Sequence, residues 1–229
     1  MDPLAGTPWS SPSTVEGFSK GEPNPVLIEY ASRIRPPHRR AWAIDIGCGA
    51  GRNAVPLARL GWRVVGTDLS RAMLDAGLTR ARSESLRDSV SLALAPMHAV
   101  PIADASADLI VAHGIWNLAA SSSEMRHAIR EAARVARPGA ALFVFTFSRH
   151  TLPPEAEPIP GEPFVFTQFS GRPQCFLTED QLIEELRAAG WERDGSVALT
   201  EYNRQPPGAL RVASGPVIYE AAFRRVSGA

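Results

Sequence analysis

One short run of glycines constrains the fold of this chain more than any other feature. The run GCGAG occupies positions 47–51, directly after an apolar segment at 42–46 and directly before a helical pattern at 53–60. Glycine lets the backbone turn sharply between a strand and a helix, and it lets a ligand approach main-chain atoms without a Cβ in the way. The first turn of the helix presents unpaired N–H groups. This arrangement predicts a ligand site at the end of the first strand of an α/β sheet.

An acidic residue follows the glycine run at a spacing typical of nucleoside-binding sheets. Asp68 ends the second expected strand, 63–67, and it stands about 20 residues beyond Gly47. A carboxylate at the carboxyl end of the neighbouring strand is placed to accept hydrogen bonds from both hydroxyls of a ribose. The sequence therefore predicts an adenosine-type ligand.

Strands and helices alternate through most of the chain, which favours a doubly wound, mostly parallel sheet. Further strands are expected at 90–95, 108–112 and 141–147, and helices at 71–81, 125–135 and 178–189. The last two strands, 192–203 and 217–225, have only a Pro-Gly-containing connection between them. Because no helix separates them, we expect an antiparallel pair at the end of the sheet.

Two proline-rich segments flank or interrupt this alternation. Residues 1–40 form an N-terminal segment with one helical candidate at 25–34, and 41–229 form the core. The N-terminal helix either packs on the core or belongs to a cap over a ligand, with Trp9 and Phe18 as wall residues.

Residues 149–177 mix prolines with phenylalanines. A long irregular segment inside a compact domain is usually functional or disordered, and the aromatic residues favour a lid.

Composition excludes several classes of protein. Lys+Arg and Asp+Glu both number 24, so the formal net charge is zero, which excludes a strongly basic nucleic-acid-binding domain. No apolar run approaches the roughly 20 residues that cross a bilayer, and no secretory signal is recognisable. The two cysteines do not make a disulfide framework. We expect a cytoplasmic protein without a nucleic-acid or membrane partner, and the oligomeric state stays open.

The residues alone leave two kinds of adenosine ligand open. The dinucleotide pattern G-x-G-x-x-G/A fits when it starts at Gly49 and continues through Gly51 to Ala54. That fit keeps an NAD(P)-dependent enzyme as an alternative. Asp45, beside the glycine run, instead suits a ligand that carries a positive group.

The glycine run with its two acids resembles motif I of the class I S-adenosylmethionine-dependent methyltransferases and the acidic partner of that motif. The stretch 100–110 is similar to their "LPF…FDLV" segment, and 136–140 is similar to their "LKPGG" turn. The sequence GCGAGRNAVPL at 47–57 is most similar to small-molecule members of the methyltransferase-11 type. The resemblance implies an α/β, doubly wound, Rossmann-like seven-stranded sheet with the last strand antiparallel. It also implies S-adenosylmethionine as cofactor and in-line methyl transfer to a small-molecule acceptor.

The resemblance further assigns roles at the cofactor site. It implies that Asp45 orients the loop and the methionine ammonium, and that Asp68 binds the ribose hydroxyls while Leu69 packs on adenine. The acid that the family usually has after the third strand aligns with Pro96, so its neighbours are expected to replace it. The full set of expected cofactor-binding residues is Asp45, Gly47, Gly49, Gly51, Asp68, Leu69, Met97, His98 and His113.

The catalytic group is not identified by the sequence. His113 ends the fourth expected strand and His150 opens the aromatic segment, so each is a candidate general base for an alcohol or phenol acceptor. His113 is equally suited to pack or to touch the cofactor through its main chain. An acceptor that is already anionic needs no base. We expect no metal site, and a protein that binds S-adenosylmethionine without catalysis is a further alternative.

Overall fold

The computed structural model describes residues 2–37, 40–204 and 215–226. The strands of the main sheet are β1 Trp42–Ile46, β2 Arg63–Asp68, β3 Val90–Leu94, β4 Ala107–His113, β5 Ala136–Phe147, β8 Trp191–Arg193, β9 Thr200–Tyr202 and β10 Ile218–Arg225. The α-helices are α1 Pro12–Lys20, α2 Pro25–Ile34, α3 Ala54–Arg59, α4 Arg71–Ser83, α5 Ser122–Val135 and α6 Glu179–Ala188. Two short strands, β6 Val165–Phe166 and β7 Gln174–Cys175, form a separate hairpin.

The strand order explains why the glycine loop lies where it does. The order is β3-β2-β1-β4-β5-β10-β8, and β9 also pairs with β10. Strands β1 to β5 are parallel to one another, whereas β10 is antiparallel to β5, β8 and β9. The predicted α/β class and the antiparallel last strand are therefore confirmed. The chain reverses its winding direction beside β1, and ligands of open α/β sheets bind at such a switch point.

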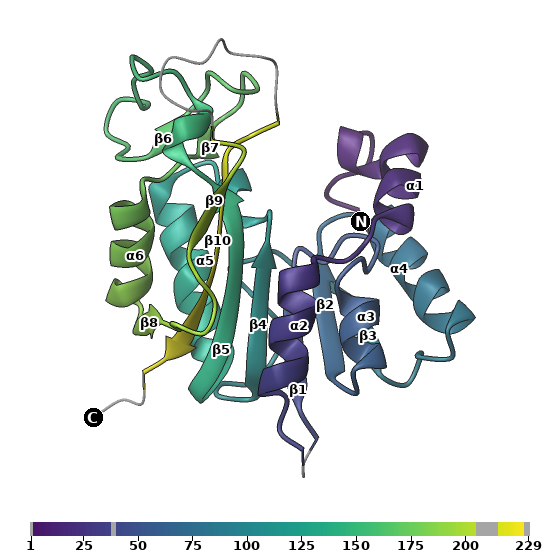
Figure 1. The fold of residues 1–229 in the computed structure, drawn as a ribbon. Helices are drawn as coiled ribbons and strands as arrows, with labels where there is room; N and C mark the ends of the chain where they lie inside the picture. The colour runs from purple at the N-terminus through teal and green to yellow at the C-terminus, as the bar shows by residue number, and fades with distance from the viewer. Residues whose placement is uncertain (1, 38–39, 205–214, 227–229) are drawn as a thin grey trace.

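Two hydrophobic layers hold the sheet between its helices (Figure 1). On one face, α5 and α6 bury residues such as Met125, Ile129 and Leu182 against β1, β4, β5 and β10. On the other face, α2 and α3 bury Leu27 and Leu57. Because both faces are covered, β4 is apolar almost throughout.

Polar caps begin the main helices where the sequence pattern places them. The side chains of Ser70 and Ser121 accept hydrogen bonds from the N–H groups of Met73 and Glu124. Thr178 begins α6 with a complete capping box. Such caps contribute about 1 kcal/mol each and fix the direction in which each helix leaves its strand.

Three local predictions differ from the structure. The N-terminal segment contains a second helix, α1, because Pro12 occupies a first-turn position where its missing N–H costs nothing. Strand β5 begins at Ala136, not at 141, because the chain pairs with Ala107 before it bulges and resumes pairing at Ala141. The strand expected at 192–203 is split into β8 and β9. The Pro-Gly connection expected after it falls in 205–214, outside the described residues.

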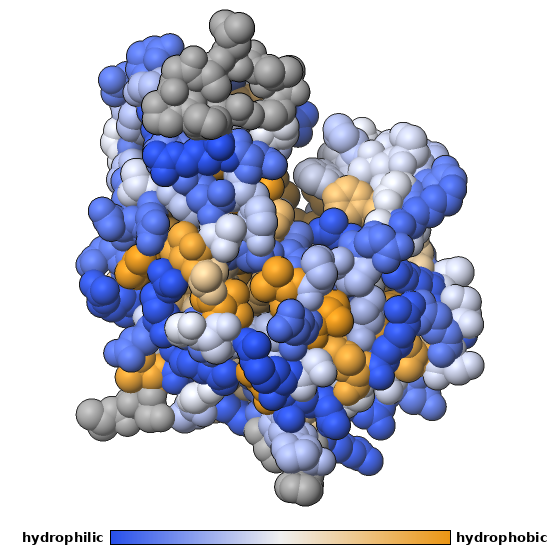
Figure 2. Space-filling model, in the orientation of Figure 1, coloured by the Kyte–Doolittle hydropathy of each residue, from blue (hydrophilic) through white to orange (hydrophobic). Residues whose placement is uncertain are grey.

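The aromatic segment 149–177 projects from the sheet as a small lobe of its own. Ser148 and Leu177 pair at its base, so it leaves and rejoins the core at one place. Leu152, Phe166 and Phe176 form its own small hydrophobic cluster. In Figure 2 a hollow separates this lobe from the lobe that carries α1. None of the described helices has the length and apolar character needed to span a bilayer.

A glycine in α4 sets how closely this helix approaches the glycine loop. A Cβ at Gly77 would lie 2.9 Å from Leu92 and 3.2 Å from the backbone carbon of Ala50.

We predict that Gly77→Ala lowers the free energy of unfolding by about 1–3 kcal/mol, since overpacking outweighs the gain in helix propensity. Gly17→Ala, in α1 with nothing within 4 Å of the added carbon, is the matched control and should raise it by up to about 1 kcal/mol. Urea denaturation measures both, and equal effects would contradict the packing argument.

Candidate functional site

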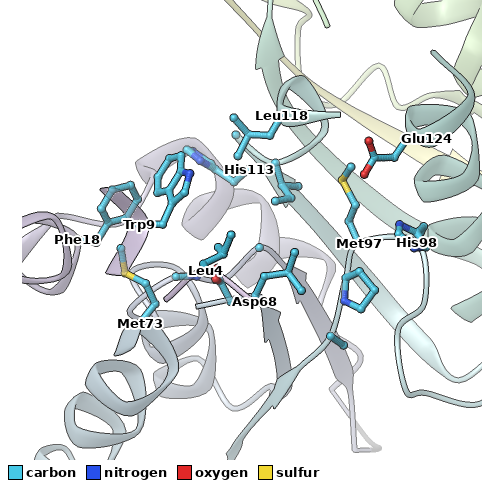
Figure 3. Close-up of a pocket in the computed structure, with 17 residues that line it drawn as sticks. Leu4, Trp9, Phe18, Asp68, Met73, Met97, His98, His113, Leu118 and Glu124 are labelled. Atoms are coloured by element: carbon cyan, nitrogen blue, oxygen red, sulfur yellow. Dashed lines mark hydrogen bonds between the residues drawn. The ribbon is translucent and has the colours of Figure 1, made fainter. Parts of the chain in front are cut away.

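The carboxyl ends of β1, β2, β3 and β4 open into one cavity of about 310 Å³. Leu4, Trp9 and Phe18 line it from the N-terminal segment (Figure 3). Trp9 and Phe18 also contact each other edge to face, with ring centroids 6.0 Å apart. The N-terminal segment therefore covers the cavity at the point where β1 ends and the glycine loop begins.

Asp68 is the central acidic group of the cavity. Its Oδ2 accepts a hydrogen bond of 2.9 Å from the Gly49 N–H, and its Oδ1 accepts one of 2.8 Å from the Ser70 N–H. Burial raises the pKa of this carboxyl, and the backbone N–H donors oppose that rise. A carboxylate has about four lone-pair sites. Asp68 is therefore fixed by the backbone and keeps acceptor capacity for a ligand.

The three glycines of the loop have different surroundings. Gly47 has a φ of +72° and lies so close to Ile115 that a Cβ would overlap this side chain. Gly49 has a φ of +52° and borders the cavity, with only Phe18 and Met73 within 4 Å of an added carbon. Gly51 lies away from the cavity against Val55. Gly47 and Gly49 thus form the floor of the site, and Gly51 serves the packing beneath it.

Asp45 lies below the loop and not on the cavity wall. It is only 2% exposed, and its Oδ2 has no hydrogen-bond partner within the described part of the chain. Burial raises its pKa to about 7, although the nearby Arg52 guanidinium and the Ala54 N–H both favour the charged form. A buried carboxyl with an unpartnered oxygen beside the loop is suited to a cationic ligand group.

His113 is held in a polar network instead of projecting freely into the cavity. Its Nδ1 lies 3.0 Å from an Arg52 nitrogen and its Nε2 lies 3.3 Å from the Asn24 amide nitrogen. The same amide donates to the buried Glu220 at 2.6 Å. The imidazole also stacks on Phe145, with centroids 4.0 Å apart. This network joins the N-cap residue of α2 to Arg52 after the glycine loop, to β4 and to β10.

The surroundings of His113 keep it neutral. Burial lowers its pKa to about 3, and the positive charge of Arg52 adds to this effect. Since Arg52 donates to one ring nitrogen, that nitrogen is an acceptor in the neutral imidazole. The geometry therefore makes His113 a structural acceptor in the cavity wall.

The wall on the β3 side comes from the segment that follows this strand. Met97 is buried and His98 is exposed, and both line the cavity with Leu69 and Pro96. Other residues line the cavity without having been predicted from the sequence, among them Met73, Ile115 and Glu124. They lie on α4, on the turn after β4 and on α5, and no periodicity indicates which helix end faces a ligand.

His150 belongs to a different cluster. Its Nδ1 lies 2.6 Å from Oε1 of Glu201, and the Ser148 hydroxyl donates to the same oxygen. Burial opposes ionisation of Glu201, but these two partners hold its pKa below the usual range. His150 is not among the residues that line the cavity. The structure thus separates the two histidines that the sequence offered as base candidates.

Comparisons with known proteins find similarity to methyltransferases. The family model described as a methyltransferase domain matches residues 44–144. The chain is 34% identical over 140 residues to methyltransferase GfsG of Streptomyces halstedii, covering 59% of this chain and about half (48%) of that relative. It is 28% identical over 173 residues to a demethylmenaquinone methyltransferase of Corynebacterium urealyticum, covering 69% and 70% of the two chains. A crystal structure of a SAM-dependent methyltransferase from Methanosarcina mazei superposes with a TM-score of 0.66 at 20% identity, covering 90% of this chain and 99% of that chain.

The raised pKa of Asp45 predicts a defined pH dependence of stability. Between the ordinary pKa of 3.8 and about 7, the folded protein holds a proton that the unfolded chain has released. Stability therefore falls as the pH rises through this window. Asp45→Asn stays neutral, so we expect it to gain up to about 3 kcal/mol over the wild type between pH 5 and pH 8.

Urea denaturation at several pH values measures this difference. Asp75→Asn is the control, because Asp75 is exposed on α4 and pairs only with Arg71 at the surface. A stability difference between Asp45→Asn and the wild type that does not change with pH would contradict the assignment.

Proposed function

We propose that the chain is a class I S-adenosylmethionine-dependent methyltransferase and that it methylates a small-molecule acceptor at the cavity described above. The observation that carries this proposal is the placement of Asp68. Its carboxylate is fixed by two backbone N–H groups at the carboxyl end of β2, beside Gly49, and it lines a covered cavity. This is the position from which a carboxylate binds a ribose diol.

The residues present fit S-adenosylmethionine, which when bound supplies a methyl group on a cationic sulfur. We propose that Asp68 accepts from the ribose hydroxyls and that Gly47 and Gly49 allow the close approach of the aminoacyl part. The unpartnered oxygen of Asp45 supports a role in placing the ammonium group, directly or through water. Leu69 and Met97 offer apolar surface for adenine.

The N-terminal segment supplies the closure that such a reaction needs. Leu4, Trp9 and Phe18 cover the cavity with apolar surface, and α1 packs on α4. Excluding water and holding two reactants in line contribute most of the rate in a displacement of this kind, about 7–11 kcal/mol from orientation alone. We propose that residues 2–24 act as the cap of the active site.

The environment of His113 points to the kind of acceptor. With a pKa of about 3 and with its acceptor nitrogen Nδ1 occupied by the Arg52 guanidinium, His113 is a poor proton acceptor. His150 lies outside the cavity lining. We propose that the acceptor is acidic enough to ionise by itself, such as a thiol or an acidic phenol or enol, and that His113 positions Arg52 and Asn24.

A small acceptor accords with the space around the cavity. The hollow between the α1 lobe and the segment 149–177 gives an approach to the cavity (Figure 2). The Corynebacterium relative is named for demethylmenaquinone, a small acceptor. The formal net charge of zero gives no support to a nucleic-acid substrate. We propose that segment 149–177 forms the outer wall of the acceptor site.

The sequence left two alternative functions open, an NAD(P)-dependent enzyme and a non-catalytic binding protein. The dinucleotide alternative has no support from the matching family model or from the two relatives described above, which are methyltransferases. A non-catalytic binder of S-adenosylmethionine is distinguished by experiment. Methyl transfer to any member of a panel of thiols, phenols and enols excludes it, whereas binding without transfer to any of them favours it.

The ribose assignment is tested by binding. We predict that Asp68→Ala weakens the binding of S-adenosylhomocysteine roughly 100-fold or more, since it removes two charge-assisted hydrogen bonds. Isothermal titration calorimetry measures the affinity. Asp75→Ala, on the exposed face of α4, is the control and should change the affinity less than twofold. Unchanged binding by Asp68→Ala would show that the ligand lies elsewhere.

The acceptor assignment predicts how the rate depends on pH. If no protein base is used, kcat/KM should rise with the ionisation of the acceptor, so its midpoint should follow the pKa of each thiol or phenol tested. Initial rates with acceptors of pKa from about 7 to about 10 measure this. A midpoint that stays the same for every acceptor would instead indicate a titrating protein group.

A further inference from the structure

The cavity extends along the carboxyl ends of three adjacent strands. Strands β1, β2 and β3 are adjacent, and their ends contribute Gly49, Asp68 and the segment 95–98 to one cavity. A nucleoside whose ribose is held at β2 and whose aminoacyl tail runs toward β1 directs its base toward β3. The segment at that end reads Ala-Pro-Met-His. It therefore offers no carboxylate to the base.

Helix α5 is hydrogen-bonded to the segment that follows residues 95–98. The Val100 N–H donates to Glu131 of α5 at 2.7 Å. Arg134 of α5 donates to the carbonyl oxygens of Val100 and Ile102 at 3.0 and 2.9 Å. The path after β3 is thus fixed along the side of α5. Glu124 stands two helical turns before Glu131 and shares its face.

Glu124 brings a carboxylate to the base end of the cavity. It lines the cavity, and in Figure 3 it lies on the same side as Met97 and His98. Its Oε2 accepts a 2.8 Å hydrogen bond from the Ala120 N–H, which fixes the side chain. Among the described residues that line the cavity, Asp68 and Glu124 carry its two carboxyl groups. Ionised carboxylates accept hydrogen bonds and do not donate them.

We propose that Glu124 reads the adenine base of the cofactor by accepting a hydrogen bond from its exocyclic amino group. This inference rests on the proposed function, because it takes the ribose to lie at Asp68. The carboxylate comes from α5 and not from the segment after β3. That segment has Pro96 at the position where the family usually has an acid. Glu124 is thereby a specificity-determining residue for adenine over a base that carries a carbonyl oxygen at the same position.

The test compares two ligands that differ at that one position. S-adenosylhomocysteine carries an amino group there, and S-inosylhomocysteine carries a carbonyl oxygen. Calorimetric titration gives the affinity of each for the wild type, for Glu124→Gln and for Glu184→Gln. The Gln side chain keeps an oxygen for the Ala120 N–H and turns an amide donor toward the base. Glu184→Gln makes the same change on the exposed face of α6, where Glu184 pairs with Arg187 at the surface and does not line the cavity.

We expect the wild type to prefer S-adenosylhomocysteine by about 10- to 100-fold, the contribution of one hydrogen bond to a charged group. Glu124→Gln should reduce this preference at least fivefold, and Glu184→Gln should leave the ratio unchanged. A Glu124→Gln variant that weakens both ligands equally, or that keeps the wild-type ratio, overturns the inference while the proposed function stands. A wild type that binds neither ligand overturns the proposed function and the inference with it.

Discussion

The hydrogen bonds that Asp68 accepts from Gly49 and Ser70 hold the site together. One carboxylate joins the end of β2, the glycine loop after β1 and the beginning of α4. The glycine loop belongs to the unit formed by β1 and α3, and Ser70 belongs to the unit formed by β2 and α4, so one carboxylate joins two neighbouring βα units. Since the same carboxylate also faces the cavity, the interaction that closes the strand-to-helix turns also prepares the surface that a ribose would meet.

A second polar network extends from this centre to the rest of the chain. Asn24 begins α2 and contacts both His113 and Glu220, while Arg52 reaches His113 from the glycine loop. These residues come from both ends of the sequence, so the cap and the last strand are fixed relative to the loop. Burying a neutral imidazole here favours positioning over proton transfer, and this is the basis for proposing an acceptor that ionises without a protein base.

The fold was predictable because its signals are local. Glycines at 47–51 and an acid at 68, a capping serine at 70 and an apolar strand at 108–112 each determine their element through nearby residues. The errors have local causes too. One helix is expected in the proline-rich segment 1–40, but Pro12 suits a first helical turn and begins a second helix. The strand after residue 192 is interrupted because two short segments pair separately with β10.

The sequence by itself determined the order of the elements, the glycine loop and the acid that follows it, because these depend on backbone freedom and short-range hydrogen bonding. Only the tertiary structure decided which side chains share the cavity. Leu4, Trp9 and Glu124 are distant from the loop along the chain, and their approach depends on how α1, α4 and α5 pack. The protonation state of His113 was likewise decided by burial and by Arg52, since a pKa depends on three-dimensional surroundings that no linear pattern records.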